Sequence, residues 1–275
     1  MAHTQREVLT ALDTLAPLVY AESWDNVGLL VDPPAEERTI GRVGFTIDLT
    51  DGPHTELLDA NVDLVVAYHP PIFGGLKRLK ASQPGPRRLM QLIQRGIPVY
   101  SPHTALDAVP GGVADWLAEG LGEAATIDPI TPSKAPLPVH EGQPVGAGRR
   151  VKLSTPTALT DLIPSLKAHL GLAHVRVAMA PAHAAGAPIT TAAVCPGAGG
   201  SLFGELRGHV DLLVTGEMRH HDILSRVGRG TSVIVTDHTN TERGYLPVMA
   251  QKLARLLPGL EVIIATADRD PLEVV

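Results

Sequence analysis

Apolar runs of strand length alternate with amphipathic stretches along most of this chain. A capping-box spacing from Thr4 to Glu7, followed by apolar residues on one helical face, predicts an N-terminal helix. Strands are predicted over residues 43–48, 62–68, 97–101, 175–178, 191–195, 211–215, 232–236 and 262–265. Further helices are predicted around residues 56–60, 89–94, 113–121, 157–170 and 241–257. This alternation predicts parallel βαβ units and therefore an α/β fold.

A proline-rich stretch over residues 128–150 interrupts the alternation. Pro136 and Pro138 exclude a helix there, so the stretch is interpreted as a connection. We therefore predict two α/β halves packed together, an N-terminal part over residues 1–127 and a C-terminal part over residues 151–275.

Composition narrows the class of protein. The 275 residues carry Lys+Arg 23 against Asp+Glu 29, a net charge of −6, which makes nucleic acid an unlikely partner because phosphate contacts need clustered Lys and Arg. The pairs Arg87-Arg88 and Arg149-Arg150 are interpreted as solvated faces. No apolar run reaches the ~18 residues of a membrane span, the first residues lack a signal pattern, and a lone cysteine, Cys195, suits a reducing compartment. A cytoplasmic protein without membrane contact is expected.

Histidines and carboxylates follow four of the predicted strands. They are His69 after residues 62–68, His103 and Asp107 after 97–101, Glu217, His220 and His221 after 211–215, and Asp237, His238 and Glu242 after 232–236. Open α/β sheets bind ligands outside the carboxyl ends of their strands, and these residue types bind Zn²⁺, Fe²⁺ or Mn²⁺. The pattern predicts a metal site at strand ends between the two halves. Glu242 is expected in the first turn of a helix starting at Thr241.

Each of these residues also has an ordinary structural interpretation. A single histidine after a strand is more often a hydrogen-bonded surface residue, Asp107 and Asp237 suit loops or caps, and His220-His221 suits a helix start. Cys195 ends an apolar strand, as a buried structural thiol does, and residues 197–200 suit a tight turn better than a phosphate loop. The metal site therefore depends on the coincidence of many residues at one sheet edge.

Several segments resemble the NIF-three-like family, whose members are also described as GTP cyclohydrolase I type 2 homologues or dinuclear-metal-centre hexameric proteins. The resembling segments are Ser23-Trp24-Asp25-Asn26-Val27-Gly28-Leu29, Tyr68-His69-Pro70-Pro71-Ile72-Phe73, Ser101-Pro102-His103-Thr104-Ala105-Leu106-Asp107, Thr215-Gly216-Glu217-Met218, His238-Thr239-Asn240-Thr241-Glu242-Arg243-Gly244 and Asp268-Arg269-Asp270-Pro271-Leu272. The resemblance runs from about residue 20 to the C-terminus, with the motifs in the same order.

The resemblance implies a two-part α/β fold assembled as a toroidal homohexamer. It also implies four metal ligands: His69, Asp107, His238 and Glu242. In that set Glu242, or Glu242 and Asp107 together, would bridge two ions. His103 falls beside this site in the motif. Some bacterial members carry an inserted third domain, which residues 128–150 are too few to form.

Tyr68 departs from the pattern of many bacterial members, which have two adjacent histidines where this chain has Tyr68-His69. The tyrosine form resembles the eukaryotic branch of the family more closely. Tyr68 thus replaces one ligand of the second metal ion. The cofactor is therefore expected to be one or two divalent ions, Zn, Fe or Mn.

Two functions from different classes follow. The first is a metal-dependent hydrolase related to GTP cyclohydrolase, in which His103 or Glu217 moves protons and a metal ion lowers the pKa of water. Its substrate would be a nucleotide or phosphoester-type metabolite. The alternative is a non-catalytic metal-binding ring that acts as an interaction or metal-handling protein.

Overall fold

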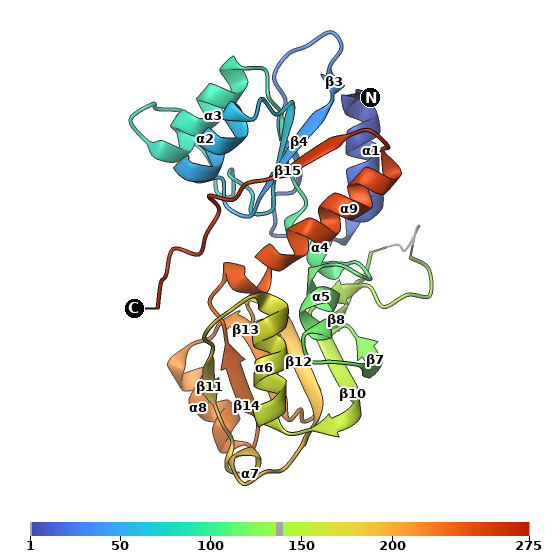
Figure 1. Ribbon diagram of the computed structural model, residues 1–275, viewed down its shortest axis with the longest axis vertical. Coiled ribbons are helices and arrows are strands. Elements are labelled where there is room, and N and C mark those ends of the chain that lie inside the picture. Colours follow the sequence, from blue (N-terminus) through green and yellow to red (C-terminus); the bar gives the residue numbers. More distant parts are fainter. Residues whose placement is uncertain (1, 136–139, 275) are drawn as a thin grey trace. The chain divides into compact units, whose positions relative to one another are not determined.

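The computed structural model describes residues 2–135 and 140–274. The chain divides into two compact units, the first made of residues 1–106 and 246–269 and the second of residues 107–245 and 270–275. Each unit contains a mixed sheet with helices packed on it (Figure 1), which confirms the predicted α/β class.

The first unit is built on a five-stranded sheet in the order β15-β4-β5-β6-β2. Its first four strands are parallel and β2 is antiparallel to β6. The strands are β15 (Glu261–Ile264), β4 (Arg42–Thr46), β5 (Leu64–Ala67), β6 (Val99–Ser101) and β2 (Gly28–Val31), and a separate antiparallel pair is formed by β1 (His3–Thr4) and β3 (Thr39–Ile40). The helices are α1 (Gln5–Leu15), the short 3₁₀ helix η1 (Leu18–Tyr20), α2 (Asp51–Asp59), α3 (Pro84–Gln94) and α9 (Leu246–Leu256), while α4 (His103–Ala108) continues into the second unit.

The core of the first unit lies around β5, whose residues are all buried. Figure 1 shows α2 and α3 on one side of the sheet and α1 and α9, which contact each other, on the other. Burial on both faces explains why the strand is a continuous apolar run. The predicted capping box between Thr4 and Glu7 starts α1.

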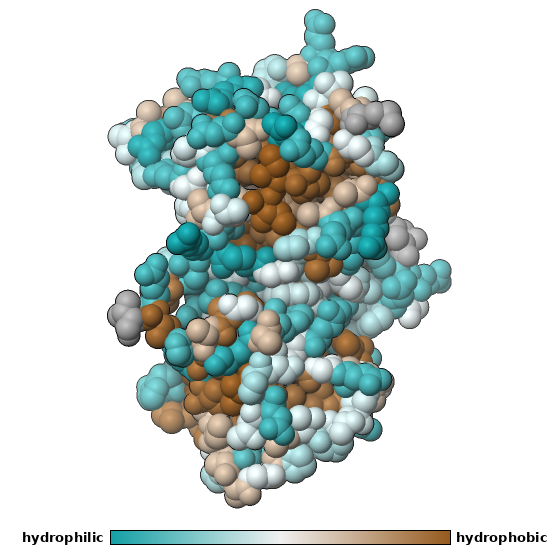
Figure 2. Space-filling view, viewed as in Figure 1, coloured by the Kyte–Doolittle hydropathy of each residue, from teal (hydrophilic) through white to brown (hydrophobic). Residues whose placement is uncertain are grey.

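The surface of each unit carries hydrophobic residues among hydrophilic ones on the face drawn in Figure 2.

The second unit contains a six-stranded sheet in the order β11-β14-β13-β12-β10-β7. β12, β13 and β14 are parallel, and the outer strands pair antiparallel. The strands are β7 (Ala124–Asp128), β10 (Arg149–Thr157), β11 (Arg176–Ala178), β12 (Ile189–Ala198), β13 (Leu212–Glu217) and β14 (Ser232–Val235), with a small β8 (Thr131–Pro132) and β9 (Gly146–Ala147) pair. The helices are α5 (Val113–Glu119), α6 (Leu159–Leu170), α7 (Pro181–Ala184) and α8 (His220–Gly228), and the 3₁₀ helices are η2 (Leu202–Glu205), η3 (Thr239–Thr241) and η4 (Arg243–Tyr245).

The chain divides at other positions than the expected boundaries at residues 127 and 150. The C-terminal α9 and β15 belong to the first unit because β15 pairs in parallel with β4. Residues 107–127 belong to the second unit, since β7 pairs with β10. The expected connection over residues 128–150 contains β8, β9 and the start of β10. Pro136 and Pro138, on which that expectation depended, lie outside the described residues.

The helix expected from Thr241 was wrong in its start. Two 3₁₀ turns, η3 and η4, precede α9, which begins at Leu246. A helix from Thr241 would have placed Pro247 in its interior, where the missing N–H and the ring of proline break the hydrogen-bond ladder. Starting at Leu246 puts Pro247 in the first turn, where no intrahelical N–H is needed. Glu242 therefore caps η3 instead of lying in the first turn of a long helix.

Within residues 2–135 and 140–274, no helix is both long enough and apolar enough to cross a bilayer.

Asp211 ties the starts of β12 and β13 together and gives a prediction for acid stability. Its Oδ2 accepts hydrogen bonds from the backbone N–H groups of Thr190 (2.9 Å) and Thr191 (2.8 Å) and from both hydroxyls. Burial alone would raise the pKa of Asp211, but these bonds outweigh it and hold the pKa below its ordinary value. The carboxylate therefore contributes stability above about pH 4, which is lost as the pH falls through the lowered pKa.

We expect Asp211→Asn to reduce the loss of unfolding free energy between pH 6 and pH 3, measured by urea denaturation. Asp128→Asn, on an exposed position of β7, is the matched control and should leave that loss unchanged. Equal acid sensitivity in Asp211→Asn and the unaltered protein would contradict the assignment.

Candidate metal centre

The parallel strands of the second unit bring their carboxyl ends to one edge. Ala198 of β12 pairs with Glu217 of β13, and Thr215 of β13 pairs with Val235 of β14. This register places Gly197, Glu217 and the segment that follows Val235 side by side, as open α/β sheets do at their ligand-binding edge.

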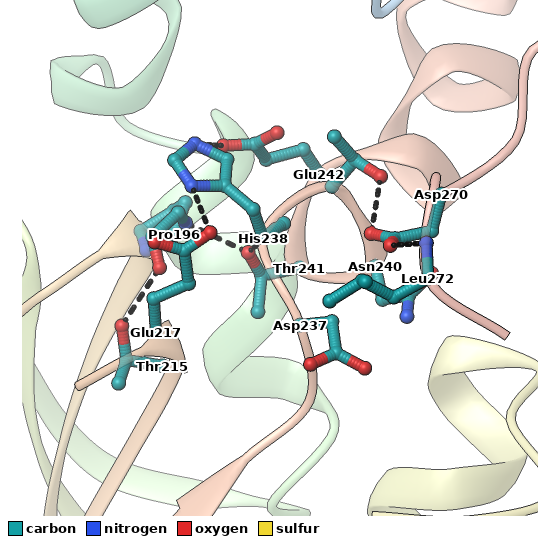
Figure 3. A network of polar contacts seen from close by, with 12 residues as sticks. Pro196, Thr215, Glu217, Asp237, His238, Asn240, Thr241, Glu242, Asp270 and Leu272 are labelled. Carbon is teal, nitrogen blue, oxygen red and sulfur yellow. Dashed lines mark hydrogen bonds and ion pairs between the residues drawn. The ribbon is translucent and has the colours of Figure 1, made fainter. Parts of the chain in front are cut away.

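His238 lies between two glutamates at this edge (Figure 3). Its Nε2 is 3.6 Å from Oε1 of Glu242, and its Nδ1 is 3.2 Å from Oε1 of Glu217. Glu242 is 3% exposed, whereas the side chain of Glu217 is 58% exposed. The carboxylate of Glu242 is thus buried, and that of Glu217 faces solvent. Imidazole and carboxylate are donors that Zn²⁺, Fe²⁺ and Mn²⁺ accept.

Gly197 and Gly216 let the backbone approach this cluster closely. Gly197 has φ +60°, and a Cβ at that position would lie 2.8 Å from Nε2 of His238 and 2.9 Å from Oε1 of Glu242. A Cβ at Gly216 would lie 2.7 Å from the carbonyl oxygens of Asp237 and Gly197. Any side chain at Gly197 would therefore fill the space in front of both donor atoms.

The turn after β14 holds His238 and Glu242 through short-range hydrogen bonds. The Thr241 hydroxyl donates to the carbonyl oxygen of His238 (2.6 Å) and accepts from the N–H of Gly197 (2.7 Å). Asn240 Nδ2 donates to the carbonyl oxygen of Thr236 (2.8 Å). These bonds join the turn to β12 and fix its backbone.

Asp107 adds negative charge near this cluster. Burial, with the charges of Asp107 and Glu242, raises the pKa of the Cys195 thiol. Cys195 is buried and stays protonated, so its interpretation as a structural thiol is confirmed. Within the second unit, His238 and Glu242 are the His/Glu donors that could hold a metal ion.

In the first unit, His69 follows β5 and is oriented by a carboxylate. Thr46 of β4 pairs with Ala67 of β5, so the residues after these parallel strands are neighbours. Asp48 Oδ1 lies 2.9 Å from Nδ1 of His69. With Nδ1 engaged in this way, Nε2 is the nitrogen that His69 can offer to a metal ion.

A second carboxylate–imidazole pair stands beside the first. Asp25 Oδ1 lies 2.8 Å from Nδ1 of His103, and Asp25 Oδ2 accepts from the N–H and the hydroxyl of Thr104. Burial would raise the pKa of Asp25, but the hydrogen bonds from His103 and Thr104 lower it, so the carboxylate is ionised. The His103 ring lies 5.4 Å from the His69 ring.

The structure brings together Glu217, His238 and Glu242 in the second unit, and His69 and His103 in the first. His220 and His221 instead begin α8 with exposed side chains, which confirms their interpretation as a helix start. Asp237 forms an ion pair with Arg176. The sequence reasoning missed Asp25, Asp48 and Gly197. Asp48 carries a usable signal, because it follows an apolar strand just as His69 does.

The chain is thus an α/β protein with a His/Glu cluster that could hold a metal ion. It belongs to the Duf34/NIF3 (NGG1p interacting factor 3) family, whose sequence model matches residues 3–271. It is 41% identical to "Protein NIF3 homolog" of Schizosaccharomyces pombe over 259 residues, 92% of this chain and 91% of the relative. It is 37% identical to "NGG1-interacting factor 3" of Saccharomyces cerevisiae over 281 residues, 98% of this chain and 96% of the relative.

Solved structures agree on the fold. The Bacillus cereus protein related to NIF3 superimposes with a TM-score of 0.87 at 16% identity, covering 99% of each chain. Reduced HcgD from Methanocaldococcus jannaschii superimposes with a TM-score of 0.78 at 20% identity, covering 97% of this chain and 99% of its own. The resemblance found in the sequence motifs is therefore confirmed at the level of family and fold.

Proposed function

We propose that the protein is a metal-dependent hydrolase that acts on a nucleotide or phosphoester-type metabolite. The observation that carries the proposal is the cluster of His238 and the buried Glu242, beside which Gly197 places no side chain. We propose Asp107 and His69 as the remaining ligands of one or two Zn, Fe or Mn ions. The Asp48–His69 pair supports this role, since a metal-binding histidine usually donates its other nitrogen to a carboxylate.

Bound at these residues, a divalent ion would lower the pKa of water toward neutrality and polarise the substrate. The remaining chemistry falls to residues of the chain. Glu217 is exposed and adjoins His238 Nδ1, so it is placed to hold or release a proton at its carboxylate. His103 offers Nε2 for the same task because Asp25 engages Nδ1.

We also propose a cytoplasmic toroidal homohexamer, in line with the family resemblance. A second candidate function is a non-catalytic metal-binding ring that acts through protein partners. It is favoured by the name of the Saccharomyces cerevisiae relative, "NGG1-interacting factor 3". The two candidates share the metal site and differ in turnover.

Glu242→Gln tests the hydrolase. Replacing the buried carboxylate with a neutral amide removes a ligand charge, so we expect metal retention to fall and metal-dependent hydrolysis of GTP or a generic phosphoester to be abolished. Metal per chain and released formate or phosphate are the measurements. Glu205→Gln, at an exposed position in η2, is the control and should behave like the unaltered protein.

Two results would count against the hydrolase. One is undiminished turnover in Glu242→Gln. The other is inertness of the metal-loaded, unaltered protein across a broad metabolite panel, and this second result would favour the non-catalytic ring.

Tyr68 gives a prediction about the number of metal ions. Its side chain is buried, and its ring lies 5.1 Å from that of His69. A phenol with an ordinary pKa of about 10 is a poor ligand at neutral pH compared with imidazole. We therefore expect one firmly held ion per chain after exhaustive dialysis, rising toward two in Tyr68→His.

Two firmly held ions in the unaltered protein would refute the weakened second position. If Tyr68 instead binds ferric iron as a phenolate, full occupancy would come with a visible charge-transfer band, and Tyr68→Phe would remove that band.

A further inference from the structure

Two large aromatic side chains lie exposed beside His103 in the first unit. Trp24 is 61% exposed and Phe73 is 58% exposed. Their rings meet edge to face, with centroids 6.1 Å apart and planes at 70°. Each ring also lies 6.2 Å from the ring of His103. Exposed apolar side chains that group together mark surfaces that bind a ligand or a partner.

Polar contacts hold the segments that carry Trp24, Phe73 and His103 in place. Asn26 Nδ2 donates to the carbonyl oxygen of Ile72, which ties the segment of Trp24 to that of Phe73. The side chain of Asp25 is 0% exposed and that of His103 is 15% exposed. Since Asp25 engages Nδ1, the Nε2 atom of His103 is the one turned away from the carboxylate.

The backbone at His103 supports a functional interpretation. This residue has φ +29°, a conformation that is unfavourable for a non-glycine residue and is found where other contacts enforce it. Asp25 supplies such contacts through the ring of His103 and the N–H of Thr104. The strained residue is the one whose ring both aromatic side chains approach.

We infer that Trp24 and Phe73 bind a planar heteroaromatic ring by stacking, and that Nε2 of His103 hydrogen-bonds to the edge of that ring. This inference rests on the proposed hydrolase function and deepens it, because it chooses the ring-bearing nucleotide over a simple phosphoester. His103 joins this stacking surface to His69, the proposed metal ligand, through the 5.4 Å ring contact.

The loop that follows Phe73 favours a phosphorylated ligand. Residues 74–80 are exposed and carry Lys77, Arg78 and Lys80 without an acidic residue, in a chain of net charge −6. Lysine and arginine on an exposed segment attract phosphoryl groups in a salt-dependent manner. A nucleotide should therefore bind more tightly than its nucleoside at low ionic strength.

Tryptophan fluorescence can test the inference without turnover or added metal. The protein has two tryptophans, of which Trp24 is exposed and Trp116 is 7% exposed. We expect adenosine and guanosine to quench the emission saturably, after correction for their absorbance. Ribose 5-phosphate, which has no aromatic ring, should not quench.

Variants identify the surface. Because stacking of a base on an aromatic side chain is worth enough to change affinity about tenfold, we expect Trp24→Ala to weaken nucleoside binding in equilibrium dialysis by about that factor. Trp24→Phe should restore most of the binding while removing the fluorescence signal. Leu224→Ala, which truncates an exposed apolar residue of the second unit, is the matched control.

Equal binding of nucleosides by Trp24→Ala and the unaltered protein would overturn the inference. So would quenching by ribose 5-phosphate alone, or a change of oligomeric state in Trp24→Ala with unaltered nucleoside binding, which would assign the surface to a second copy of the chain. Nucleoside binding without metal-dependent hydrolysis would leave the stacking site standing and remove the hydrolase.

Discussion

Arg149→Ala should lower the free energy of unfolding by about 3–5 kcal/mol, the range found when one partner of a buried ion pair is removed. Arg149 is 0% exposed, and its guanidinium forms an ion pair with Asp115. It also donates to the carbonyl oxygens of Ala108 (3.1 Å) and Val109 (3.0 Å) at the end of α4. Removing it would leave these carbonyl groups and the Asp115 carboxylate without their charged donor.

Arg150 is the matched control because it is the next residue on the same strand. It is half-buried and donates to the carbonyl oxygens of Arg207 (2.7 Å) and His209 (3.2 Å) at the surface. Water can replace these exposed hydrogen bonds, and a hydrogen bond contributes about 0.5–1.5 kcal/mol net, so Arg150→Ala should be milder than Arg149→Ala. Urea denaturation of both variants is the measurement, and equal losses would contradict the structural role of Arg149.

Arg149 also bears on the candidate site. Ala108 and Val109 directly follow Asp107, the carboxylate proposed as a metal ligand. The guanidinium therefore holds the backbone next to that ligand. Arg149→Lys keeps the charge and loses the five-donor fork, so it should retain part of the stability while metal retention falls.

The sequence interpretation of Arg149-Arg150 as a solvated face was wrong for Arg149, which is 0% exposed. Hydropathy alone assigns an arginine to the surface. Arg149 is buried because its position on β10 places the guanidinium next to the end of α4, where the last carbonyl groups of the helix need donors. That demand arises from a contact between residues 40 positions apart, which a local pattern does not contain.

More of the residues at the edge of the second sheet could be predicted from the sequence. Apolar runs predicted β13 and β14, and the rule for parallel strands predicted that Glu217 and His238 would follow them at one edge. The apolar pattern did not predict which residues of neighbouring strands lie side by side, because the strand register determines this. Asp48 lies next to His69 only because Thr46 pairs with Ala67, and strand pairing of that kind is set by tertiary packing.

The sequence also did not indicate which glycine at this edge is required by the structure. Residues 197–200 were interpreted as a tight turn, but Gly197 and Ala198 are the last residues of β12, and only Gly200 lies in the turn that follows. Which of the glycines is required could not be inferred from the run itself. The approach of His238 and Glu242 distinguishes Gly197 from its neighbour Gly200, whose Cβ would meet nothing nearer than Oδ2 of Asp222 at 3.8 Å.

Gly197→Ala should therefore disrupt the cluster, and Gly200→Ala should not. At φ +60° an alanine costs roughly 1–2 kcal/mol in backbone strain. Its Cβ would also force His238 Nε2 and Glu242 Oε1 away from the positions they hold, at 2.8 Å and 2.9 Å from that atom. Displaced metal ligands and their supports typically lower affinity by about 10–100-fold, so we expect metal per chain after dialysis to fall sharply in Gly197→Ala. Gly200→Ala should change stability by about 0.5 kcal/mol or less and retain metal as the unaltered protein does. If Gly197→Ala loses stability yet retains its metal in full, the ion is held elsewhere, and His238 and Glu242 are not its ligands.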